Sequence, residues 1–78
     1  MSLEVFIDIH KNDSPIEKIS VLMTQIDILN SDRYNEGWFS ARDSVDNAKY
    51  FYKESLAIHE RIKWLLEELK KDLKEESR

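Results

Sequence analysis

The sequence predicts a mostly α-helical protein, an antiparallel helical hairpin with a long C-terminal helix and a short N-terminal β-strand or extended arm. Three observations support this class: a long amphipathic pattern in the second half, a helix-start signal at Ser14, and only one glycine and one proline among 78 residues. A chain with so few helix breakers has little irregular structure. We expect one domain, with the strand or arm at 1–12, a first helix at 14–36 and a second at 40–76.

The N-terminal segment alternates between apolar and mostly polar positions. Its aliphatic residues stand at every second place: Leu3, Val5, Ile7 and Ile9. This period of two, with its β-branched residues, predicts a half-buried strand. No second strand follows, and an isolated strand leaves its backbone N–H and C=O groups unpaired. The segment would therefore pair with the same strand of a second copy, add to a partner's sheet, or lie as an arm on the helices.

The start of the first helix is the most specific local pattern in the chain. Ser14 stands at the N-cap, Pro15 at the first helical position and Glu17 at the third, which is a capping box. The helix that follows is apolar on two faces. One face carries Ile16, Ile19, Leu22, Met23, Ile26 and Leu29, and the other carries Val21 and Ile28. A helix of this kind is normally covered on both sides.

The end of the first helix is less sharply marked. Residues 30–32 are weak helix formers, yet Gly37 suits the left-handed position that follows a helix C-terminus. We therefore expect the helix to run to about Asn35 and residues 37–39 to form a tight connection. Ser40 would then cap the second helix.

The second helix is expected to be unbroken. Apolar residues recur at spacings of three and four from Val45 to Leu73, and no glycine or proline follows Trp38. Roughly 37 residues at about 1.5 Å each would give a helix of about 55 Å, longer than a small domain of ~30 Å. The first helix would cover it only as far as about Ile62.

The uncovered end of this helix predicts an intertwined homodimer. Leucines beyond Ile62 would project past the first helix, to be covered either by the N-terminal strand or by a second copy, and the strand would need a pairing partner. The residues that we expect at the contact between copies are Val5, Ile7, Ile62, Leu65, Leu66, Leu69 and Leu73.

A second strip on the long helix is a candidate surface for another protein. Tyr50, Ala57 and Trp64 are seven residues apart, almost opposite the main apolar stripe, and Lys53 and Arg61 lie beside them. The strip could pack inside a dimer. It could also bind a partner, because tryptophan, tyrosine and arginine are enriched among the residues that dominate binding energy at interfaces.

Charge argues against binding to nucleic acid. The net charge of −4 lies entirely in residues 1–39, which hold seven acids and three bases. Phosphate binding depends on clustered lysine and arginine. The order strand, helix, helix is also that of ribbon-helix-helix DNA-binding dimers. In such a dimer, however, the strand would present Glu4 and Asp8 to the DNA, where carboxylates repel phosphate.

The sequence contains no recognisable catalytic, cofactor or metal site. There is no cysteine, neither His10 nor His59 has a second ligand at helical spacing, and one glycine cannot build a phosphate-binding loop. No apolar run reaches the ~18 residues of a membrane span, and no secretion signal is evident. We expect a cytoplasmic, non-catalytic protein.

The expected function is that of an acidic regulatory or adaptor protein that binds another protein, of the kind encoded by phages or other mobile elements. Two alternatives remain open, a ribbon-helix-helix-like DNA-binding dimer and a structural coiled-coil element.

Overall fold

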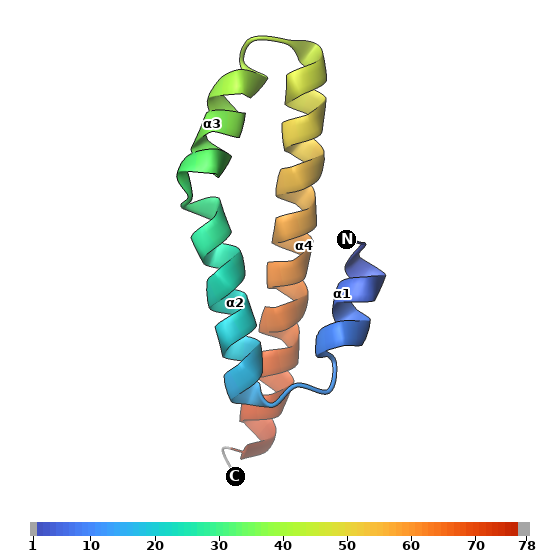
Figure 1. Cartoon of the computed structure of the whole chain (residues 1–78). Helices are drawn as coiled ribbons and strands as arrows, with labels where there is room; N and C mark the ends of the chain where they lie inside the picture. Colours follow the sequence, from blue (N-terminus) through green and yellow to red (C-terminus); the bar gives the residue numbers. More distant parts are fainter. Residues whose placement is uncertain (1, 77–78) are drawn as a thin grey trace.

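The computed structural model describes residues 2–76; Met1 and residues 77–78, which fall in the predicted single domain, lie outside this range. The described chain forms four α-helices: α1 (Leu3–His10), α2 (Pro15–Leu29), α3 (Asp32–Ala41) and α4 (Val45–Glu76). Figure 1 shows α2 and α3 following one another along α4, which runs in the opposite direction, and α1 beside the C-terminal half of α4. The mostly helical class is confirmed.

The strand predicted at the N-terminus is a helix. Ser2 caps α1 by accepting a hydrogen bond from the backbone N–H of Val5 through its hydroxyl. A helix satisfies its backbone groups within the segment, whereas an unpaired strand cannot. The alternation of aliphatic residues was misleading because Phe6, which stands between them at one of the alternate positions, is the one α1 residue that becomes fully buried.

The predicted capping box at the start of α2 is confirmed. The Ser14 hydroxyl accepts from the Glu17 N–H at 3.2 Å, and the Glu17 carboxylate accepts from the Ser14 N–H at 3.1 Å. The single helix predicted for residues 14–36 is divided, however. The chain leaves helical geometry at Asn30, and Ser31 begins a new helix by accepting from the N–H of Tyr34. Local hydrogen bonding by these small polar side chains outweighs helix continuation.

The connection predicted at residues 37–39 lies later in the chain, because Gly37 is inside α3 and has no left-handed conformation. Its lack of a side chain serves packing instead, since an added Cβ would stand 3.3 Å from the Phe51 ring. The reversal occupies residues 42–44. Ser44, rather than the predicted Ser40, accepts from the N–H of Asn47 at the start of α4.

The long helix α4 is unbroken, as predicted, over 32 residues. It sets the shape of the molecule, whose extents are 52 × 22 × 16 Å. Four apolar side chains are buried: Phe6, Ile58, Leu65 and Leu69. Nearer the reversal, the Tyr34 ring of α3 packs on Phe51 at 4.9 Å, and its hydroxyl lies 2.6 Å from the Ser55 hydroxyl.

The side of α2 that faces α4 is polar at its centre. Lys18 is 4% exposed and Gln25 is 6% exposed, while no apolar residue of α2 is fully buried. These two positions are seven residues apart and lie between the two apolar faces of the helix. One apolar face of α2 is therefore directed to each side of the hairpin.

Candidate functional site

The predicted partner strip on α4 is divided by α1. Trp64 lies under α1, where its ring meets Phe6 edge to face at 5.9 Å between centroids. Tyr50 is 68% exposed and Lys53 is also exposed. The five predicted residues therefore do not form one continuous free surface, because α1 covers the C-terminal end of the strip.

Arg61 lies at the boundary between the covered and open parts of the strip. Its guanidinium stands 5.5 Å from the centroid of the Phe6 ring, a cation–π contact. Its Nη1 also donates to the Gln25 side chain at 3.4 Å. Arg61 thus connects all three helices at this end of the molecule, α1, α2 and α4.

An open groove begins at Arg61 and runs along α4 toward the reversal. It has a volume of about 600 Å³ and lies where the chain breaks between α2 and α3. We call it the groove. Its lining residues are Thr24, Asp27, Ile28, Ser31, Arg33, Tyr34, Glu54, Ala57, Ile58 and Arg61. Two of the five predicted partner residues, Ala57 and Arg61, belong to it.

The groove combines an apolar interior with charges of both signs. Ile28, Ala57 and Ile58 supply the apolar part, while Asp27 and Glu54 oppose Arg33 and Arg61. The lining residues come from both sides of the helix break and from the facing part of α4. Residues 30–32 are weak helix formers, but a groove at this point was not predicted, because the first helix was expected to continue through them.

The hydroxyl groups that line the groove are engaged in structural contacts. The Ser31 hydroxyl donates to the Ile28 carbonyl at 2.7 Å, and the Tyr34 hydroxyl pairs with Ser55. His59 Nδ1 contacts the Ser55 carbonyl oxygen at 2.7 Å, and His10 Nδ1 contacts the Asp13 carboxylate at 2.8 Å. Neither contact joins a histidine to a hydroxyl, the pairing that activates a serine nucleophile.

The residues predicted for self-association lie in three environments. Leu65 is 0% exposed and Leu69 is 6% exposed, so both are buried within one chain. The expectation that the first helix covers α4 only as far as about Ile62 is wrong, because α2 reaches Asp72 and α1 also packs on α4. Ile7 and Ile62 are half-buried. Val5, Leu66 and Leu73 are 49%, 53% and 48% exposed.

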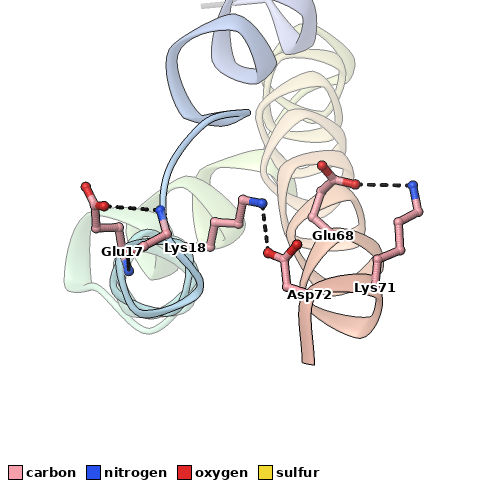
Figure 2. A network of polar contacts seen from close by, with 6 residues as sticks. Glu17, Lys18, Glu68, Lys71 and Asp72 are labelled. Carbon is pink, nitrogen blue, oxygen red and sulfur yellow. Dashed lines mark hydrogen bonds and ion pairs between the residues drawn. The ribbon is translucent and has the colours of Figure 1, made fainter. Parts of the chain in front are cut away.

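An ion pair closes the hairpin near its C-terminal end. Lys18 Nζ of α2 lies 2.9 Å from Asp72 Oδ2 of α4, with the lysine side chain 5% exposed and the carboxylate side chain 28% exposed. Figure 2 shows Lys18 reaching across from α2 to Asp72, beside the Lys71–Glu68 pair of α4. A signal for the inward position of Lys18 was present in the sequence, since Lys18 lies midway between the two apolar faces.

No protein-family model, curated protein or solved structure matches this chain. Among residues 2–76, no three histidine, cysteine or acidic side chains gather in a way that could hold a metal ion. The helices of the described part are too short or too polar to cross a lipid bilayer.

Proposed function

We propose that this chain is a non-catalytic regulatory or adaptor protein that binds an amphipathic helix of another protein in the groove. The observation that carries the proposal is the continuity of the groove with the position of α1. Both lie on the same side of α4, and Arg61 contributes to both. The chain therefore already places one short helix on this side and leaves the adjoining length open.

The contacts of α1 with α4 indicate which kind of side chain a partner would insert into the groove. Phe6 is held between the Trp64 ring and the Arg61 guanidinium, and it is 3% exposed. Ala57 lies one helical turn before Arg61 and leaves room above α4. A partner helix would insert a large apolar side chain over Ala57 in the way that α1 inserts Phe6. Grooves between helices commonly take amphipathic helices in this manner.

Charge specifies the partner further. Asp27 and Glu54 would attract lysine or arginine beside the apolar side chain, and Arg33 would attract an acid. The proposed ligand is therefore a helix with one large apolar anchor flanked by charges of both signs. The DNA-binding alternative has less support, because it required a strand at the N-terminus, where α1 is a helix.

The proposal is tested by capture from the native host with three immobilised proteins, followed by mass spectrometry. Ala57→Phe fills the groove, and Glu67→Phe adds the same ring at an exposed position of α4 outside the groove. A protein retained by the original chain should be lost with Ala57→Phe and kept with Glu67→Phe. Circular dichroism checks that all three remain folded.

A second variant separates loss of binding from loss of fold. Arg33 is exposed at the groove edge, so Arg33→Glu should reduce capture without lowering the melting temperature. Retention that is equal for all four proteins would contradict the proposal. The proposal would also be contradicted if a protein is captured but none of its amphipathic helices protects the groove residues from hydrogen exchange.

A further inference from the structure

Helix α1 occupies the surface of α4 that continues the groove. Ala57, Arg61 and Trp64 follow one another along one side of α4, at spacings of four and three residues. Ala57 and Arg61 line the groove, whereas Arg61 and Trp64 hold the Phe6 ring of α1. Release of α1 would therefore lengthen the groove along α4 by roughly one helical turn, to Trp64.

The groove itself is shorter than an ordinary helix. Its wall on α4 runs over residues 54–61, which is about 10 Å of helix. Helices in proteins average about 10–14 residues, or roughly 15–20 Å. At the end near the reversal, the Tyr34 and Phe51 rings pack together at 4.9 Å and fill the space between α3 and α4. A bound helix would therefore extend in the other direction, toward Trp64, and meet α1.

Helix α1 is attached to α4 through one fully buried side chain. Phe6 is 3% exposed, whereas Val5 and Ile9 are 49% and 53% exposed. A helix of eight residues is unstable in water by itself, and ordering it costs conformational entropy at every residue. We therefore expect α1 to open locally while the rest of the protein stays folded.

The hairpin does not need α1 to begin α2 or to join α2 to α4. Ser14 and Glu17 cap α2 by hydrogen bonds to each other. Lys18 of α2 pairs directly with Asp72 of α4. Both contacts lie outside α1, so its release would leave the start of α2 in place against α4.

We propose that α1 is a displaceable occupant of the partner site. An incoming helix binds over Ala57, displaces α1, and inserts a second large apolar side chain where Phe6 lies against Trp64 and Arg61. The inference rests on the proposed function, since it describes how the same groove is extended and regulated. The kind of occupant is indicated by α1 itself, an amphipathic helix with an aromatic anchor. The partner should carry two large apolar side chains on one face, one or two helical turns apart.

Docking of α1 would lower the apparent affinity for the partner. The whole site is open only in the fraction of molecules from which α1 is released, and the apparent Kd rises by the inverse of that fraction. Variants that release α1 should therefore bind the partner more tightly.

The first measurement uses the free full chain and needs no partner. In hydrogen exchange read by NMR, the amides of residues 7–10 should be at least about tenfold less protected than those of α4 around Leu65. Equal protection would overturn the proposal, because α1 would then open only when the whole protein unfolds.

The second measurement repeats the capture from the native host with variants of α1. Phe6→Ala removes the docked ring, and Ile9→Pro breaks α1 at an exposed position. Each should retain several-fold more of the groove-binding protein than the original chain when that protein is limiting. Val5→Ala is the matched control, since it truncates an exposed residue of α1 without breaking the helix, and it should retain as much as the original. Circular dichroism should show the loss of no more than one short helix in Phe6→Ala and Ile9→Pro.

The inference and the proposed function fail in different ways. Capture that is lost in Ala57→Phe but is not raised by Phe6→Ala or Ile9→Pro would overturn the displacement of α1 and leave the groove proposal standing. A gain that persists when Phe6→Ala is combined with Ala57→Phe would also overturn it, because the retained protein would then bind outside the groove. Capture of no protein by either the original chain or Phe6→Ala would refute the proposed function and this inference with it.

Discussion

Lys18 of α2 and Asp72 of α4 form an ion pair of 2.9 Å across the hairpin, 54 residues apart in the sequence. The lysine is almost completely enclosed, at 4% exposure, whereas the carboxylate keeps some access to water. Such a pair fixes how α2 is rotated against α4. That rotation directs one apolar face of α2 to the side of α1 and the groove and the other to the opposite side of the hairpin.

Removal of the Asp72 carboxylate alone should lower the stability of the fold. Asp72→Asn leaves the Lys18 ammonium enclosed without its counter-charge, and we expect a loss of about 2 kcal/mol in the free energy of unfolding, less than the ~3–5 kcal/mol for a fully buried pair. The measurement is urea denaturation. Replacement of both partners, by Lys18→Met with Asp72→Leu, should cost under about 1 kcal/mol because no charge is left buried. Equal losses for the single and double variants would contradict this account of the pair.

Phe6 should determine whether α1 stays on α4. Phe6→Ala removes the ring between Trp64 and Arg61, and an eight-residue helix is unstable by itself. We expect α1 to unfold, with a loss of helicity equivalent to one short helix and a shift of Trp64 emission to longer wavelength. The fluorescence is read in a Trp38→Phe background, which leaves one tryptophan.

The control for this prediction is Val5→Ala on the same helix. Val5 is 49% exposed, so its truncation should leave both helicity and emission nearly unchanged. Unchanged emission in Phe6→Ala would show that α1 is held by contacts other than the Phe6 ring.

The parts of the fold that could be predicted from sequence are those fixed by local interactions. The capping box at Ser14 and the unbroken α4 depend on residues within one or two turns. The N-terminal helix could not be predicted in this way, because the alternation of Leu3 to Ile9 favours a strand. Its docking depends on Phe6 meeting Trp64, 58 positions later.

Only the part of the groove that depends on one helix could be predicted from the sequence. Ala57 and Arg61 were identified from their position on α4, and both line the groove. The remaining walls come from the break at Asn30 and Ser31, whose effect depends on how α3 packs against Phe51. The residue pattern of one helix shows which of its faces is apolar, but not which neighbouring helix will cover that face. In this structure α1 covers Trp64 of α4.

Gly37 should tolerate alanine with a small gain in stability. Replacing a glycine within a helix by alanine contributes up to about 1 kcal/mol, while the new Cβ would stand 3.3 Å from the Phe51 ring. Phe51 is only half-buried and can move by a few tenths of an ångström. We expect a net gain of about 0.5 kcal/mol in thermal or urea unfolding.

The comparison for Gly37→Ala is Gly37→Val, which adds two methyl groups against the same ring and a β-branched side chain. It should destabilise the protein relative to Gly37→Ala by about 1 kcal/mol or more. A loss of stability in Gly37→Ala itself would mean that the Phe51 ring is held rigidly by its contact with Tyr34.

Leu65 and Leu66 are adjacent in the sequence, but only the stability cost of truncating Leu66 should depend on protein concentration. Leu65 is fully buried inside one chain, so Leu65→Ala should cost about 3 kcal/mol at every concentration. Leu66 is 53% exposed in one chain and is one of the residues predicted at a contact between copies. Leu66→Ala should cost under about 0.5 kcal/mol in dilute protein. Its cost should rise with concentration, because the original chain then gains stability from self-association that the variant lacks. Urea unfolding at micromolar and near-millimolar protein measures both, and a cost for Leu66→Ala that does not change between them would place its contacts within one chain.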